Sequence, residues 1–127
     1  MLKALILMLA VTVGGSAAYA QGGTGDANDF LSQYDAASPT GRQLLEMFII
    51  GQERGILVAN QFLKVARSKN TIYCPPDDAA LAPTQLVDMT RKTVASDGRI
   101  GTMPLSVVVL MTLQRNYPCA KTDRPKN

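Results

Sequence analysis

Few residues of this chain could act in catalysis or bind a metal, and histidine is absent. The chain has 127 residues, two cysteines, Cys74 and Cys119, and no histidine. It therefore cannot build a Ser-His-Asp or Cys-His site, a histidine-ligated metal site or a histidine pH switch. A nucleophilic cysteine needs a neighbouring group that lowers its pKa, and two thiolates alone are a poor metal site. We expect a binding or structural protein with no metal and no cofactor.

The carboxylates do not change this interpretation. Asp77 and Asp78 are adjacent and follow two prolines, and such pairs are more often turn or cap residues than acid–base pairs. Glu46 and Glu53 have no base or nucleophile beside them in the sequence pattern. We predict that the protein is not an enzyme and has no catalytic residues.

The N-terminus has the pattern of an export signal. Lys3 precedes an apolar run from Ala4 to Val13, and Ala18-Tyr19-Ala20 has the small-residue spacing of a cleavage site. The run is well short of the ~20 apolar residues that span a membrane as a helix. We predict a cleaved signal peptide over residues 1–20, a periplasmic protein and no membrane association after cleavage. The formal charge of +3 is too small to suggest nucleic acid as a partner.

An oxidising compartment changes the expected role of the two cysteines. An even count in a small exported chain favours one disulfide, Cys74–Cys119. In the chain-entropy model, closing a loop of about 46 residues stabilises the fold by roughly 4 kcal/mol. We interpret both cysteines as structural.

The mature chain is predicted to be all-α, a small bundle of three to four helices. Residues 21–40 are predicted to form a flexible leader containing at most one helical turn, and residues 41–119 the helical domain. Residues 120–127 are predicted to form a polar tail. Helices are expected over residues 42–68, from Pro83 to about 95 and over 105–116. In the last segment the run Val107-Val108-Val109 also suits a strand, but its length and the preceding Pro104 favour a helix.

The longest helix is predicted to bury one apolar stripe. At 100° per residue one face collects the residues that we expect in the core: Leu44, Phe48, Gly51, Gly55, Val58, Phe62 and Val65. The opposite face collects the polar residues: Glu46, Glu53, Asn60, Gln61 and Lys64. Ile50 and Leu57 project from this polar side, so the helix is either central to its domain or shares a face with another chain. A homodimer through Ile50 and Leu57 is therefore one of two open interpretations.

Three short segments, in order, resemble a known family. The segments are Phe48-Ile49-Ile50-Gly51, Tyr73-Cys74-Pro75-Pro76 and Tyr117-Pro118-Cys119, with Gln85-Leu86-Val87 between the last two. Over about residues 41–119 the chain is similar to the Tai/Rap immunity proteins of type VI secretion systems. Leu45 stands where many members carry a further cysteine.

The resemblance implies a small exported helical protein that binds a peptidoglycan amidase toxin, as a dimer, and inhibits it with a loop. In this sequence the loop is residues 96–101, where Ile100 is an expected apolar anchor and Asp97 and Arg99 are expected charged contacts. A plain helix–helix turn, in which Gly98 and Gly101 only satisfy backbone geometry, is the alternative.

A general periplasmic chaperone of the HdeA type is the alternative function. Those proteins are also small, helical and pinned by a disulfide. A binder triggered by acid needs groups that titrate near its switch, and this chain has no histidine.

Overall fold

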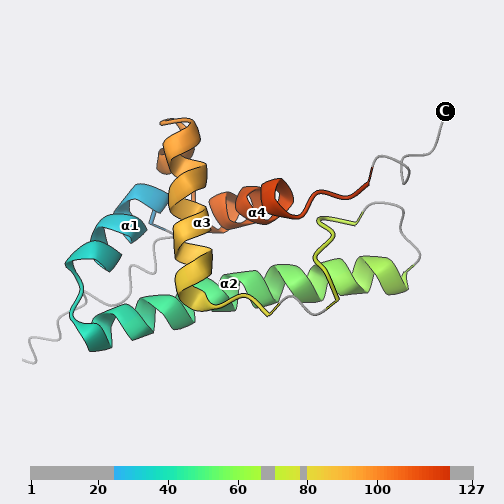
Figure 1. Ribbon diagram of the computed structural model, residues 1–127, viewed down its shortest axis with the longest axis horizontal. Helices are drawn as coiled ribbons and strands as arrows, with labels where there is room; N and C mark the ends of the chain where they lie inside the picture. The colour runs from blue at the N-terminus through green and yellow to red at the C-terminus, as the bar shows by residue number, and fades with distance from the viewer. Residues whose placement is uncertain (1–24, 67–70, 78–79, 121–127) are drawn as a thin grey trace, which may run out of the picture.

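The computed structural model describes residues 25–66, 71–77 and 80–120. Within them the fold is all-α with one disulfide, as the sequence predicts (Figure 1). The predicted signal peptide and residues 121–127 of the predicted tail lie outside the described residues. No helix in the described ranges is both long and apolar enough to cross a bilayer. The helices are α1 (Ala27–Ala36), α2 (Pro39–Val65), α3 (Pro83–Ser96), the short 3₁₀ helix η2 (Ile100–Thr102) and α4 (Leu105–Asn116).

Local residues set where the helices begin. The Asp26 carboxylate accepts a hydrogen bond from the Asp29 N–H at 2.8 Å and caps α1, and the Ser38 hydroxyl accepts one from the Gly41 N–H at 3.2 Å and caps α2. Proline occupies the first position of both α2 and α3, where its missing N–H costs no intrahelical bond. The segment with the Val107-Val108-Val109 run is helical.

The prediction of a flexible leader over residues 21–40 was wrong for residues 27–36. Residues 27–36 form α1, and Phe30 and Leu31 on this helix are buried in the core. The outer side of α1 is tied to α3 by a bidentate ion pair, in which Arg91 donates to both oxygens of Asp35 at 2.7 and 3.0 Å. A ten-residue helix is marginal in isolation, so its stability comes from this packing and not from a local signal that the sequence displays.

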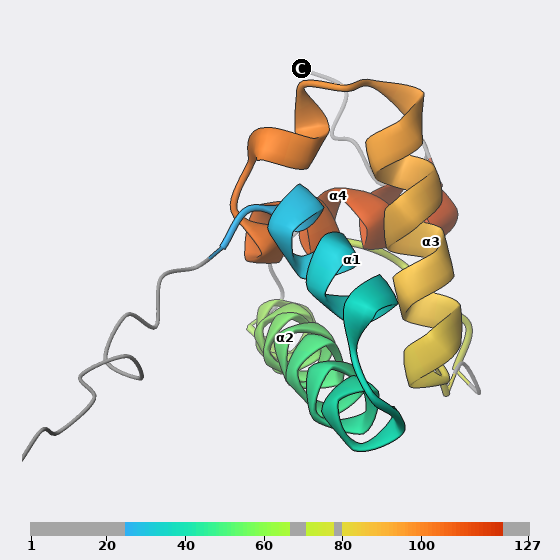
Figure 2. The same cartoon turned by 90° about the vertical axis from the view of Figure 1, so that its left-hand side faces the viewer.

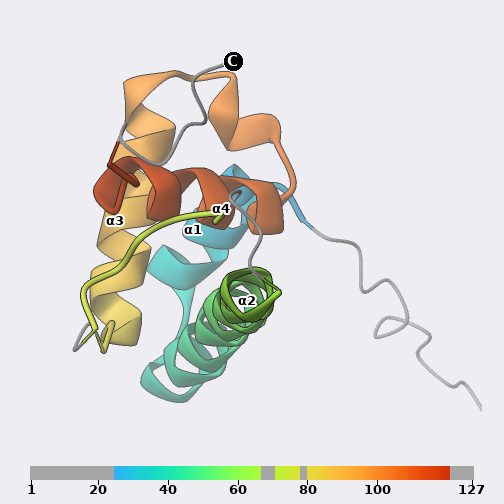
Figure 3. The same ribbon diagram turned by 90° about the vertical axis from the view of Figure 1, so that its right-hand side faces the viewer.

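The other helices all lie on one side of α2. In Figure 1, α2 runs along the lower edge, α1 and α4 lie above it, and α3 rises across it; the perpendicular views show the first turns of α3 beside α2 (Figures 2 and 3). The core lies between them. Its buried apolar residues are Ala27, Phe30, Leu31, Ile49, Tyr73, Leu86, Val87, Ile100, Leu105, Val108, Val109 and Leu113.

The rotation of α2 about its axis is opposite to the prediction. Every large side chain on the face that we expected in the core is exposed. Glu53 and Asn60, from the face that we expected in solvent, are buried. Gly51 and Gly55 are also exposed, and nothing lies within 4 Å of where their Cβ atoms would be. The helix is apolar on both sides, so hydrophobicity alone could not tell which side faces inward.

A buried asparagine fixes the inward side. Asn60 is 1 % exposed, and its side-chain amide donates to the Tyr73 carbonyl at 2.8 Å. Its carbonyl oxygen accepts from the N–H groups of Ile72 and Tyr73 at 2.7 and 3.3 Å. The Asn60 side chain thus replaces the backbone partners that the irregular segment before Cys74 lacks, because buried backbone groups must be paired.

The disulfide joins the same segment to the end of α4. Cys74 and Cys119 are bonded, with their Cα atoms 4.9 Å apart, which confirms the predicted bridge. The Cys74 N–H also donates to the Tyr117 carbonyl at 2.9 Å, and the rings of Tyr73 and Tyr117 lie 6.5 Å apart. The chain before α3 and the chain after α4 are therefore held together by covalent, polar and aromatic contacts.

Removing the disulfide should lower the free energy of unfolding substantially. We expect Cys74→Ser to cost about 2–5 kcal/mol in denaturant unfolding, as for native bridges in small exported domains. Cys119→Ser should cost the same, and the double variant no more than either single one, because all three lose one bridge. Two free thiols in the denatured, unreduced wild-type protein would contradict the pairing.

Replacing Asn60 should be costly although the residue is polar. We expect Asn60→Ala to lower the free energy of unfolding by about 2–4 kcal/mol, because it leaves buried groups of Ile72 and Tyr73 without partners. Gln61→Ala, at the exposed next position, is the matched control and should change stability by less than about 0.5 kcal/mol. Equal effects of the two variants would show that the buried amide does not hold the segment.

Candidate functional site

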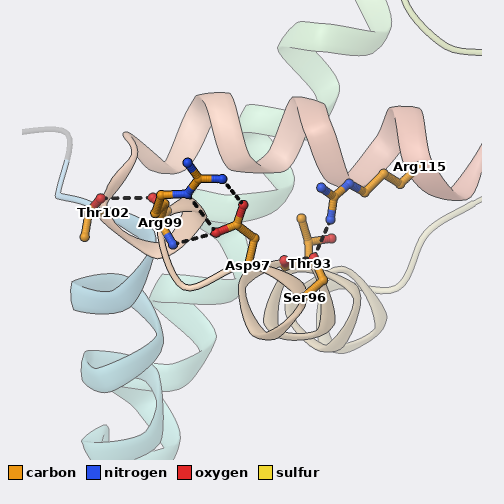
Figure 4. A network of polar contacts seen from close by, with 6 residues as sticks. All are labelled: Thr93, Ser96, Asp97, Arg99, Thr102 and Arg115. Atoms are coloured by element: carbon orange, nitrogen blue, oxygen red, sulfur yellow. Dashed lines mark hydrogen bonds and ion pairs between the residues drawn. The ribbon is translucent and has the colours of Figure 1, made fainter.

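The connection between α3 and α4 carries the predicted binding residues (Figure 4). Asp97 and Arg99 contact each other across the turn. The Asp97 carboxylate accepts from the Arg99 backbone N–H at 3.0 Å and from its guanidinium at 3.1 and 3.3 Å. The hydrogen bonds from Arg99 hold the pKa of Asp97 below its ordinary value, so this carboxylate stays charged to a lower pH than an ordinary aspartate.

A second set of polar contacts ties the end of α3 to α4. The Ser96 hydroxyl donates to the Thr93 carbonyl at 2.6 Å, and the Arg115 guanidinium donates to the Ser96 hydroxyl at 2.5 Å (Figure 4). Because Arg115 lies in the last turn of α4, where the helix dipole favours positive charge, it stabilises its own helix as well as the contact. Sequence reasoning missed this residue, since its partner is distant in the chain.

Ile100 is not an exposed anchor. It is 3 % exposed and packs in the core, so the prediction that it contacts a partner directly was wrong. The next residue, Gly101, is buried against α1, and a Cβ there would overlap the side-chain amide of Asn28. Ile100 stands between Gly98 and Gly101 in the sequence, and this pattern does not show whether its side chain points into solvent or into the core.

The start of α1 braces the loop from its other side. The Ala27 N–H donates to the Met103 carbonyl at 3.1 Å, and the Leu105 N–H donates to the Gly25 carbonyl at 3.3 Å. Asp26 and Pro104 form an antiparallel bridge between these bonds. The connection is therefore held by α1, by α3 and by its own buried isoleucine, and it is not a free hairpin tip.

The whole connection between α3 and α4, residues 97–104, is called the braced loop. It presents a cation and an apolar side chain to solvent. The Arg99 side chain is 88 % exposed even though it is paired with Asp97. Met103, which the sequence analysis did not single out, is 37 % exposed, and Gly98 and Thr102 beside them are also exposed. Of the predicted contacts, the structure brings Asp97 and Arg99 together at the surface and removes Ile100 from it.

The buried Glu53 is the strongest candidate for acid–base chemistry among the described residues, and its surroundings do not suit it. It is 4 % exposed, and the Tyr73 hydroxyl lies close to it in the core. Burial, together with the nearby Glu53 carboxylate, raises the pKa of Tyr73 to about 12. The phenol is therefore a weaker acid than an ordinary tyrosine, and a substrate could not reach either group through the closed core.

The adjacent carboxylates Asp77 and Asp78, expected as turn or cap residues, are only partly described. Asp77 is exposed, and Asp78 lies outside the described residues. Across residues 25–66, 71–77 and 80–120, no cluster of three or more Cys, Asp or Glu side chains has the arrangement of a metal site.

Ile50 and Leu57, the predicted dimer face, are partly buried and pack against the hydrophobic core. The interpretation that placed them at the centre of the domain accounts for them. The exposed apolar face of α2 lies on the other side of the helix.

The chain was compared with protein families, with curated proteins and with solved structures. No protein-family model, no curated protein and no solved structure matches the chain.

The role of Ile100 can be tested by stability alone. We expect Ile100→Ala to lower the free energy of unfolding by about 2–5 kcal/mol, because it leaves a cavity in the core. Met103→Ala, three residues away and partly exposed, should cost less than about 1 kcal/mol. Thermal or denaturant unfolding of the two variants gives the comparison, and a harmless Ile100→Ala would contradict the anchored loop.

Proposed function

We propose that this chain is a periplasmic immunity-type protein that inhibits a peptidoglycan amidase by direct contact. The proposal starts from the segments that resemble the Tai/Rap family. In the structure two of them, Tyr73-Cys74-Pro75-Pro76 and Tyr117-Pro118-Cys119, form one unit through the disulfide and the Cys74–Tyr117 backbone bond. Their proximity supports reading them together as one motif.

The observation that carries the proposal is the braced loop with its exposed cation. A loop that is already ordered loses little conformational freedom when it binds, so its contacts contribute more fully to affinity. Arg99 provides a guanidinium that can pair with carboxylates or stack on aromatic rings, and Met103 provides a flexible apolar contact beside it. This combination suits insertion into a groove of another protein.

The experiment is inhibition of amide cleavage in purified peptidoglycan. The probe enzyme is the peptidoglycan amidase encoded nearest to the gene of this chain, with the full-length exported protein as inhibitor. We expect stoichiometric inhibition, and we expect Arg99→Ala and Met103→Glu each to raise the inhibition constant at least about tenfold, as for central contacts of an interface.

Two controls separate the loop from the rest of the molecule. Arg42→Ala removes an exposed arginine in the first turn of α2 and should leave inhibition unchanged. Circular dichroism of each variant should match the wild type, because the replaced side chains are at the surface. If the wild-type chain does not inhibit the amidase, the proposed function is wrong. If it inhibits equally well without Arg99 and Met103, the loop is not the binding surface.

A further inference from the structure

The outer face of α2 is an exposed apolar stripe along nearly the whole helix. Among the described residues, six of the eight large apolar side chains that are exposed belong to α2, and the other two are less exposed than any of these. The six, with their exposed fractions, are Leu44 (64 %), Met47 (71 %), Phe48 (52 %), Val58 (65 %), Phe62 (71 %) and Val65 (83 %). Exposed apolar side chains gathered on one face of a small protein mark an interaction site.

The spacing of this stripe indicates that its partner is another helix. Five of these six side chains, all but Met47, stand together with the two exposed glycines at positions 44, 48, 51, 55, 58, 62 and 65, which are separated by alternating steps of four and three. This is the 3.5-residue repeat of a helix that packs lengthwise against a second helix. Residues 44–65 cover about 32 Å at 1.5 Å per residue, which is long enough for several layers of contact.

The order of large and small residues within the stripe makes it complementary to itself. When α2 is laid antiparallel on a second α2, Leu44 meets Phe62 of the second copy and Phe48 meets Val58. At the centre Gly51 meets Gly55, where the absence of side chains lets the two helix axes approach closely. The layers between Leu44 and Phe62 therefore pair large with large or glycine with glycine, and Val65 in the outermost layer meets Gly41; each pair occurs twice, as two-fold symmetry requires.

The surroundings of the stripe permit this arrangement. The other described helices gather on one side of α2 (Figures 2 and 3), and the stripe residues are exposed, so these helices do not cover the stripe. Near the two-fold axis the stripe is flanked by Gln52, which is uncharged, and by Arg54, whose Nε lies 3.4 Å from the Glu53 carboxylate. Antiparallel packing also opposes the two helix dipoles.

We propose that the apolar stripe of α2 is a homodimer interface, in which a second copy of this chain packs antiparallel with Gly51 and Gly55 at the two-fold axis. This interface is distinct from Ile50 and Leu57, which face the core. It does not depend on the amidase-inhibitor function, because it uses a different face of the molecule.

Sedimentation equilibrium of the full chain is the first test. We expect a dimer at about 50 µM, since the contact area of one helix pair is at the lower end of that of stable interfaces. Val58→Asp and Phe62→Asp should each give a monomer with unchanged circular dichroism, because both positions are exposed in the single chain. Val107→Asp, at an exposed position of α4 outside the stripe, is the control and should remain a dimer.

The central glycines give a sharper test. In the single chain, the side chain introduced by Gly55→Leu has open space around it. Leucine also forms helices better than glycine, so the variant should raise the Tm of the dilute monomer. At the two-fold axis the same side chain blocks close approach, so the variant should be monomeric at about 50 µM under the conditions above. A Gly55→Leu variant that still dimerises overturns the proposal.

Engineered disulfides determine whether the two copies of α2 pack antiparallel or parallel. A mixture of Gly51→Cys and Gly55→Cys chains should oxidise to the mixed disulfide, because these positions face each other only in the antiparallel pair. Cross-linking of each variant with itself indicates parallel packing and overturns the proposed interface. A wild-type protein that sediments as a monomer also overturns it, even if the stripe then binds lipid vesicles or a foreign protein.

Discussion

The hydrogen bonds of Asn60 are the constraint on which the structure of this protein depends. A buried side-chain amide that satisfies three backbone groups cannot be turned towards solvent without leaving those groups unpaired. It therefore fixes the rotation of α2 and brings the segment before Cys74 across this helix. Once α2 has this orientation, Ile49 and the partly buried Ile50 and Leu57 point into the core, and the stripe from Leu44 to Val65 points out.

The same constraint organises the opposite end of the domain. The segment held by Asn60 carries Cys74, and the disulfide to Cys119 fixes the end of α4. Helices α3 and α4 lie between Cys74 and Cys119 in the sequence. The disulfide joins the start of α3 to the end of α4, and the connection from α3 to α4 covers the core at the opposite ends of these two helices. Ile100 fills that core from the loop and leaves Arg99 exposed above it. The two surfaces that we propose as binding surfaces, the loop and the stripe, are consequences of one packing arrangement.

The sequence predicts the parts of this fold that depend on neighbouring residues. Proline at position 83 begins α3, and the even cysteine count in a chain with an export-type N-terminus gives the disulfide. It does not predict the rotation of α2, because this helix is apolar on both faces, and its polar Glu53 and Asn60 were assigned to solvent. Helix α1 and the buried position of Ile100 were also missed, since both are stabilised by contacts with residues far away in the chain.

We propose that α2 packs against its own domain with one face and against a second copy of the chain with the other. Isotope-filtered NOE spectra of a mixed sample, half ¹³C-labelled and half unlabelled, test this most directly at the level of single contacts. We expect intermolecular NOEs from the Phe62 ring to the Leu44 methyl groups and from the Phe48 ring to those of Val58, and none to Ile50 or Leu57. Intermolecular NOEs that involve Ile50 or Leu57, or none at all from the stripe, would contradict it.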